Sequence, residues 1–322
     1  MTDILPEDQQ LKKRFLTQSF FTGLGITLAN LSLFVSKYIG GAAQLRYPRY
    51  WVFLLLFGVD LFYYVGDVLR QQNPRDSAFR RGMAYPQCEK GGFFKPIHDI
   101  FSAIKDMPKS LWQLASVYLF QWYAMFCYWQ FIAPCLAKSI WSTEDTKSTM
   151  YQEAVAFTGL VNGFYNIITF MSAFVLAYYA QKFKAKYVHA LCLLWAGLSL
   201  LYLPQLQGLE NQYFVLIPIF GFGVAWASMM GVPYVIVAAD IPETRRGVYM
   251  GIINMMIVIP MIIQNLTFGG HAGVYKSFLG GDPTHAIMFA GVLLLIAAVL
   301  TTFIHERRLE GQTVVMQGGG GH

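Results

Sequence analysis

Charged residues are scarce in this sequence. Only 13% of its 322 residues are charged, whereas 55% are hydrophobic and 16% are aromatic. Soluble domains usually carry about 25% charged residues. The missing charges leave long uncharged runs, which argue against a soluble domain. They predict an all-α integral membrane protein that crosses the bilayer several times.

Cysteine and histidine are also few. The sequence holds four cysteines and six histidines, and no metal-type spacing joins the cysteines, so we expect neither a metal site nor a disulfide framework. His189, His271 and His285 lie at or near the ends of predicted spans without a partnered acid, and we assign them no role. No cluster of His and Asp, and no nucleophile beside a base, indicates catalysis. We therefore expect a protein that is not an enzyme and that uses no cofactor.

Eight apolar runs each approach the roughly 20 residues that a helix needs to cross the hydrocarbon core. Backbone amides inside a bilayer must be paired within the protein, so helices are expected, and the alternation typical of barrel strands is absent. The predicted spans are 15–38, 50–69, 111–136, 152–180, 187–203, 213–239, 247–268 and 285–304.

Basic residues are distributed unequally between the two sides of this membrane. Most of the 24 Lys and Arg residues fall in the loops on the side that holds both termini. The positive-inside rule therefore predicts cytoplasmic termini and a multi-pass protein of the cell (inner) membrane. The net charge of +6 reflects this bias and does not indicate nucleic-acid binding. The basic residues on the opposite side are Lys37, Arg46, Arg49, Lys138, Lys147 and Lys276.

The longest loop, 71–110, separates two predicted spans from six. In its second half, Ile97, Ile100, Phe101 and Ile104 fall on one helical face. This pattern favours a short amphipathic helix along the membrane surface, and a tether without fixed structure is the alternative.

A phrase near the start of the chain is repeated near its end. "LPEDQQLKKRF" at 5–15 and "IPETRRGVYMG" at 241–251 both place a Pro-Glu pair before basic residues and an apolar span. The 12-helix transporters of the major facilitator superfamily consist of two six-helix halves related as parallel repeats. The connector before the fifth helix of such a protein corresponds to the one before the eleventh. The repeat thus predicts that the first span here corresponds to the fifth of twelve.

Three longer phrases resemble the glycoside–pentoside–hexuronide:cation symporters, especially their sucrose- and maltose-transporter-like members. They are "TQSFFTGLGITLAN" at 17–30, "MPKSLWQLASVYLFQWYAMFCYWQF" at 107–131 and "IPETRRGVYMGIINM" at 241–255. The resemblance covers nearly the whole chain except 64–92.

The resemblance implies a 12-helix fold that lacks its first four helices. Residues 1–70 would be a remnant of the N-terminal half, namely its fifth and sixth helices, and 71–110 the cytoplasmic connector with its amphipathic helix. Residues 111–305 would form the complete six-helix second half, and 306–322 a cytoplasmic tail.

The same resemblance implies secondary active transport of a glycoside, with a disaccharide favoured, coupled to a cation such as H⁺. The expected partners are thus a small sugar, a coupling cation and the lipid bilayer. We expect transport at least in a full-length form. The alternative is a truncated, non-transporting remnant or a partner subunit of a membrane complex.

The third predicted span carries a wide polar and aromatic arc. At 100° per residue its two tryptophans share one face, and pairs of amide and tyrosine side chains flank them. Sugar sites combine aromatic faces with amides and hydroxyls, so this arc is a candidate substrate-cavity wall. The alternative is that the amides bond neighbouring helices together. The candidates are Gln121, Trp122, Tyr123, Tyr128, Trp129 and Gln130.

A second polar stripe lies on the fourth predicted span. Asn162, Tyr165 and Asn166 follow helical spacing together with Thr158 and Thr169. The stripe is either a cavity lining or a hydrogen-bonded seam between helices.

The seventh predicted span holds weaker candidates. Asn254 and Asn265 are eleven positions apart and so face nearly the same way, with Gln264 beside Asn265. Of these, Asn254 is included among the substrate-binding candidates.

One acid interrupts an apolar run. Asp60 stands near the middle of the second predicted span, where ionisable groups are costly and often functional. It is a coupling-ion candidate, and a neutral carboxyl bonded to a neighbouring helix is the alternative.

The connector "DIPETRRG" resembles the charged loop motif of the superfamily. Asp240 or Glu243 could pair with Arg245 or Arg246 of a neighbouring loop and hold one gating state. Anchoring of the arginines on the cytoplasmic side explains them equally well.

The topology can be checked through Cys88, which falls in the predicted cytoplasmic loop. A membrane-impermeant maleimide should label Cys88 only after the cells are permeabilised. A Cys88→Ser chain is the control for labelling elsewhere. Ready labelling of Cys88 in intact cells would reverse the predicted orientation.

Overall fold

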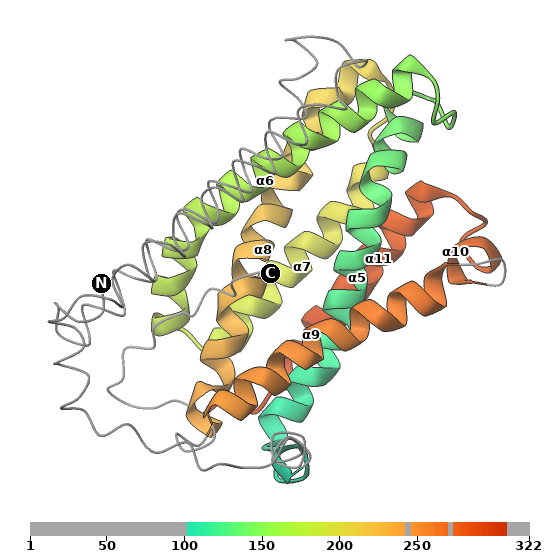
Figure 1. Ribbon diagram of the computed structural model, residues 1–322. Helices are drawn as coiled ribbons and strands as arrows, with labels where there is room; N and C mark the ends of the chain where they lie inside the picture. Colours follow the sequence, from blue (N-terminus) through green and yellow to red (C-terminus); the bar gives the residue numbers. More distant parts are fainter. Residues whose placement is uncertain (1–101, 242–245, 270–272, 308–322) are drawn as a thin grey trace, which may run out of the picture.

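The computed structural model describes residues 102–241, 246–269 and 273–307, and within them the chain is all-helical without a strand (Figure 1). The predicted spans 15–38 and 50–69, and with them Asp60, lie outside the described residues. So do Glu243, Arg245 and His271.

Six long helices occupy the positions of the six remaining predicted spans. They are α5 (Lys109–Ser139), α6 (Thr149–Lys182), α7 (Ala185–Tyr202), α8 (Leu216–Val237), α9 (Arg246–Phe268) and α11 (Pro283–Thr302). Short helical turns complete the connections: η2 (Leu203–Gln205), η3 (Leu209–Val215), η4 (Ala238–Asp240) and α10 (Val274–Ser277).

Five of these long helices are apolar enough to cross a membrane. The exception is α5, which at 31 residues is long enough. Its glutamines, tryptophans and tyrosines make it less hydrophobic than its neighbours. The chain is thus an all-helical protein with several helices fit to span a membrane, and the predicted total of eight spans stays a prediction.

Local sequence explains where two helices begin. The Oγ of Ser148 accepts a hydrogen bond from the backbone N of Tyr151 at 3.1 Å and caps α6. Asp282 caps α11 through Thr284 N at 2.9 Å, and Pro283 follows at the first helical position. Both are preferred helix-starting arrangements because they satisfy backbone N–H groups that lack an intrahelical partner.

The long helices pack in a definite order. α11 lies along both α5 and α7, α8 lies along both α6 and α7, and α9 lies along α5 (Figure 1). The axes of α5 and α8 come close at few places. Aromatic side chains fill the seam between them: the rings of Tyr128 and Phe222 are 4.2 Å apart, and those of Trp122 and Trp226 are 5.9 Å apart.

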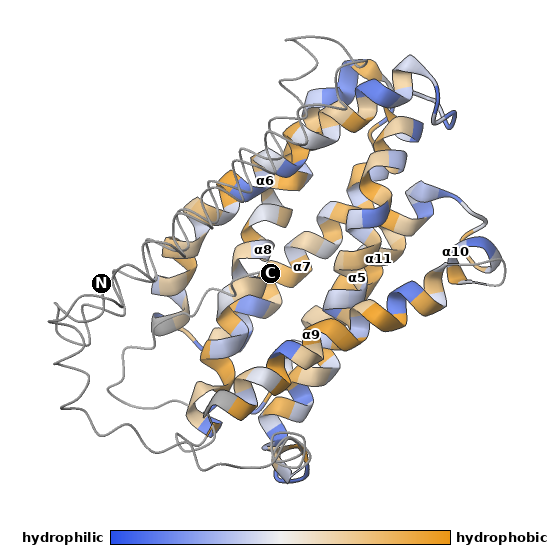
Figure 2. Ribbon diagram, in the orientation of Figure 1, coloured by the Kyte–Doolittle hydropathy of each residue, from blue (hydrophilic) through white to orange (hydrophobic). Residues whose placement is uncertain are grey.

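Hydrophobic residues predominate along the long helices (Figure 2), and many large ones are exposed. Met171 on α6, Leu191 on α7 and Ile262 on α9 are more than half exposed. Soluble monomers rarely expose contiguous apolar surface of this extent. Contact with lipid explains it.

A close helix approach joins α7 to α11 through two glycines. A Cβ on Gly291 would stand 2.8 Å from the backbone oxygen of Gly197, and a Cβ on Gly197 would stand 2.9 Å from the backbone oxygen of Gly291. Small residues at such crossings allow two backbones to approach, which is how membrane helices gain packing energy.

Substitution of Gly291 tests this contact. We expect Gly291→Ala to lower the free energy of unfolding by about 1–3 kcal/mol, because the new methyl group forces the two backbones apart. Gly251→Ala on α9 is the matched control, since a Cβ there meets nothing within 4 Å. The control should be neutral or stabilising by up to about 1 kcal/mol because alanine favours the helix. Equal thermal unfolding of the two variants in detergent would refute the close contact.

Candidate functional site

The side chains of the predicted polar arc of α5 face four neighbouring helices. Gln130 faces α9, Tyr128 faces α6 and α8, and Gln121 faces α7. The structure therefore separates side chains that helical periodicity placed in one arc.

An amide cluster joins α5 to α9. Gln130 donates from Nε2 to Oδ1 of Asn265 at 3.0 Å, and Gln264 donates from Nε2 to Oε1 of Gln130 at 3.1 Å. Gln264 is fully buried, whereas Gln130 and Asn265 are exposed. One turn away, the hydroxyls of Tyr123 and Thr267 are 2.8 Å apart. The cluster is thus anchored inside the bundle and open at its surface.

A row of indole rings begins beside this cluster. Trp129 is 37% exposed, and its ring lies 5.6 Å from that of the half-buried Trp226 on α8. Trp226 in turn lies 5.9 Å from the buried Trp122. Trp129 and Gln130 of α5, together with Gln264 and Asn265 of α9, are called the α5 face. It combines an accessible aromatic ring with side-chain amides.

Gln121 is bonded inside the bundle. Its Oε1 lies 3.1 Å from Nε2 of His189 on α7, and Nδ1 of His189 lies 2.8 Å from Oγ of Ser228 on α8. All three side chains are fully buried. The amide nitrogen of Gln121, however, has no hydrogen-bond partner. A buried polar group left unsatisfied costs about 1–3 kcal/mol, so this one needs an explanation.

The predicted stripe on α6 lies in a hydrogen-bonded seam. The hydroxyl of Tyr128 donates to Oδ1 of Asn162 at 3.4 Å, and Nδ2 of Asn166 donates to the backbone oxygen of Asn162 at 2.7 Å. Thr169 donates to the backbone oxygen of Gly223 on α8 at 2.9 Å.

Tyr165 and Asn254 complete the predicted set. The ring of Tyr165 packs against those of Tyr128 and Phe222, at 6.3 and 5.5 Å. Asn254 lies exposed on α9, apart from these contacts. The structure thus brings Tyr128, Asn162, Tyr165 and Asn166 together and leaves Asn254 outside that group.

Asp240 ends the turn η4, where the connector to α9 begins. Its carboxylate accepts a hydrogen bond from Oγ of Ser110 at the start of α5, and it lies 3.6 Å from Nε of Arg307. The predicted pairing with Arg245 or Arg246 stays a prediction, because Glu243 and Arg245 are outside the described residues and Arg246 begins α9 with its side chain not described. The contacts of Asp240 link α5, the end of α8 and the segment after α11.

That segment after α11, residues 303–307, is held by side chains that the sequence did not single out. Gln113 donates to the backbone oxygen of Phe303 at 3.0 Å and accepts from the backbone N of His305 at 2.8 Å. The carboxylate of Glu306 accepts from the backbone N of Ala185 and Lys186, at 2.9 and 3.1 Å. Glu306 therefore caps α7, which has no side-chain cap of its own.

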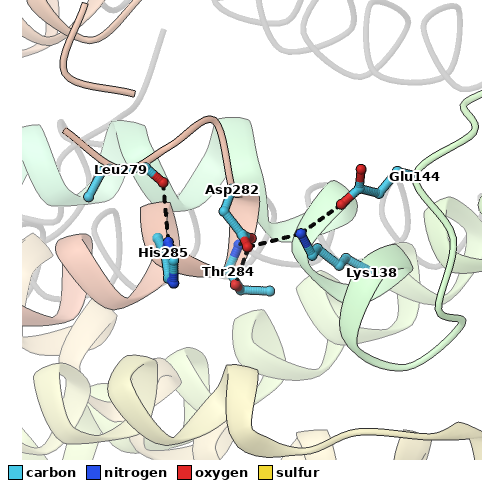
Figure 3. Close-up of polar contacts among 6 residues, drawn as sticks. All are labelled: Lys138, Glu144, Leu279, Asp282, Thr284 and His285. Carbon is cyan, nitrogen blue, oxygen red and sulfur yellow. Dashed lines mark hydrogen bonds and ion pairs between the residues drawn. The ribbon is translucent and has the colours of Figure 1, made fainter. Parts of the chain in front are cut away.

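The opposite end of the bundle carries an ion-pair cluster (Figure 3). Lys138, at the end of α5, is 2.6 Å from a carboxylate oxygen of Glu144 and 2.9 Å from one of Asp282. The hydrogen bonds that Lys138 donates to Glu144 and then to Asp282 raise the pKa of Lys138. Partial desolvation raises the pKa of Asp282, but hydrogen bonds from Thr284 and Lys138 outweigh it and lower the pKa to about 2.

Metal ligation finds no support in the described ranges. Within them, no group of three or more His, Cys, Asp or Glu side chains could hold a metal ion. The chemistry that this part of the chain offers is hydrogen bonding by amides and hydroxyls, together with aromatic packing.

Asp282→Asn isolates the charge of the ion-pair cluster, because asparagine can still cap α11. A depressed carboxylate pKa adds stability above the unfolded pKa, near 4, and that stability is lost as the pH falls towards 2. At pH 7 we expect the variant to unfold more easily, by up to about 1 kcal/mol. The difference should shrink between pH 5 and pH 3 in thermal unfolding experiments. Glu210→Gln, at an exposed carboxylate of η3, is the control, and a pH-independent difference for Asp282→Asn would contradict the assignment.

Comparisons with known proteins add no assignment. No family model matches the chain, and no curated protein is significantly similar to it. Support for a function therefore comes from the α5 face and its surroundings, together with the resemblance of the sequence phrases.

Proposed function

We propose that the chain serves secondary active transport of a glycoside, with a disaccharide favoured, coupled to a cation such as H⁺. The proposal includes a major-facilitator-type architecture and a place in the cell (inner) membrane with both termini cytoplasmic. The single observation that carries it is the α5 face. There an exposed tryptophan immediately precedes Gln130, whose side chain is hydrogen-bonded to two further amides in a bundle with helices fit to span a membrane.

The chemistry of the α5 face suits a sugar. One face of a pyranose ring is apolar and packs on an aromatic ring, which Trp129 offers. Sugar hydroxyls both donate and accept hydrogen bonds, and each side-chain amide has two hydrogens and two lone pairs to match them. Gln130 and Asn265 use only part of this capacity on each other. A ligand at the surface can engage the rest.

The buried amide beneath them keeps the site in shape. Gln264 donates to Gln130 and is fully buried. Its bond fixes the Gln130 carboxamide plane while the outer edge of that amide stays accessible. Sites of this kind bind well because few side-chain rotamers must be ordered when the ligand arrives.

Proline residues give the helices around the face a means of bending. Pro134 lies four residues after Gln130 in α5, so the backbone oxygen of Gln130 lacks its usual helical partner. Pro233 stands within α8 and Pro260 within α9. Bends near a central site support the rocking movement by which such transporters alternate access.

Sugar binding tests the proposal. The purified chain is titrated with a panel of disaccharides and tryptophan fluorescence is measured. We expect saturable binding that Trp129→Ala or Gln130→Ala weakens about tenfold or more, since each removes a ring face or an amide contact. Gln205→Ala, in the exposed turn η2, is the control and should bind normally. Melting curves would verify that every variant is folded.

The coupling cation is examined in the same titration. Linkage requires that a cation which is co-transported changes sugar affinity, and that sugar changes cation affinity by the same factor. Sugar affinity is therefore compared across pH and across Na⁺ concentrations. Unchanged sugar affinity in both Trp129→Ala and Gln130→Ala would refute the α5 face as the site. A chain that binds no disaccharide at all would refute the proposed function.

A further inference from the structure

Three polar groups on one face of α5 are buried without a hydrogen-bond partner. They are the hydroxyl of Tyr118, the amide nitrogen of Gln121 and the indole nitrogen of Trp122. Spacings of three and four residues place them on one face of the helix. Tyr118 and Gln121 are 0% exposed and Trp122 is 4% exposed. Buried polar groups are almost always paired, so three adjacent exceptions point to a ligand.

Tyr118 and Trp122 lie in the aromatic seam between α5 and α8, and Gln121 faces His189 of α7, which is bonded to Ser228 of α8. The rings of Tyr118 and Trp122 are 6.1 Å apart, and Trp226 of α8 packs edge-on against Trp122. The same Trp226 reaches Trp129 on the α5 face. The unpaired groups therefore lie along an aromatic row that leads inward from the accessible tryptophan.

The hydrogen bonds of Gln121 determine which end of its amide is free. Oε1 of Gln121 can only accept, so the hydrogen between it and His189 Nε2 belongs to the imidazole. On the other side of the ring, Nδ1 lies 2.8 Å from the Ser228 hydroxyl. The imidazole is thus held at both nitrogens by two helices, and it fixes the Gln121 oxygen. The NH₂ group of Gln121 consequently stays free to donate.

The chemistry of the unpaired groups defines the ligand class. Two of them, Gln121 Nε2 and Trp122 Nε1, can only donate hydrogen bonds, and the hydroxyl of Tyr118 can donate as well. Such a set fits oxygen acceptors and disfavours a cation. Hydroxyl oxygens of a glycoside and of water share this chemistry.

We propose that His189, held by Ser228, is a positioning residue that orients Gln121 to donate a hydrogen bond to a glycoside hydroxyl in a buried subsite beyond the α5 face. The inference rests on the proposed function, because the ligand is the transported sugar. It assigns roles to two residues, on α7 and α8, that do not touch the sugar themselves.

The test measures disaccharide affinity of the full chain in detergent, using the sugar that binds best in the panel above. His189→Leu and Gln121→Leu should each weaken binding about tenfold, as expected for the loss of one buried hydrogen bond. The double variant should be no weaker than either single one, because His189 acts through Gln121. His189→Gln places an amide donor near the lost Nε2 and should restore affinity to within about twofold of the unsubstituted chain.

Two further variants separate positioning from stability. Ser228→Ala removes only the outer bond and should weaken binding about threefold with little loss of fold. Thr158→Val is the control, because that buried hydroxyl bonds only to its own helix, at Ala154 O, 2.9 Å away. It should leave sugar affinity unchanged.

Three results would overturn the inference. Unchanged affinity in folded His189→Leu, or in Ser228→Ala if the leucine variant does not fold, would mean that water alone meets Gln121. Losses that multiply in the double variant would show independent roles. If the unsubstituted chain binds no disaccharide, the proposed function fails, and the role of His189 fails with it. This result is seen before any residue is substituted, so it is distinct from the other two.

Discussion

An amide on a membrane helix must find its hydrogen-bond partner within the protein, and α5 carries three glutamines under this constraint. Gln113 holds the segment after α11, Gln121 reaches His189 on α7, and Gln130 is bonded to α9. They stand at successive levels along one helix. Each therefore ties α5 to a different part of the chain: the segment after α11, α7 and α9.

Periodicity could predict the positions of the long helices, because apolar length decides where a helix can cross a bilayer. It could also predict that Gln121 and Gln130 lie on polar parts of α5. It could not predict which neighbour each would meet, because that depends on helix order and rotation. His189 shows the limit most clearly: its partners Gln121 and Ser228 are 68 and 39 residues away, and no local pattern connects them. Glu306 was missed for the same reason, since a helix cap supplied from a distant segment leaves no local trace.

The contacts at the two ends of the bundle differ in kind from those in the middle. Charged groups act at the ends, where Lys138 joins Asp282 and where Glu306 caps α7. Neutral amides and hydroxyls act between them. This division follows from desolvation, because an ion pair in the hydrocarbon region loses more hydration energy than its attraction returns. Both ends tie α11 to its neighbours, so α5, α7 and α11 form the firmly joined part of the described structure.

α9 is attached differently. It packs along α5 and has few contacts with the other long helices, and much of its connection runs through Gln130, Gln264 and Asn265. A sugar that uses the remaining hydrogen-bonding capacity of both Gln130 and Asn265 would bridge α5 and α9. Occupancy of the proposed site and the position of α9 would then be coupled, because a ligand shifts an equilibrium by its different affinity for the two arrangements. The same amides that suit the site to a sugar thus offer a route from binding to helix movement.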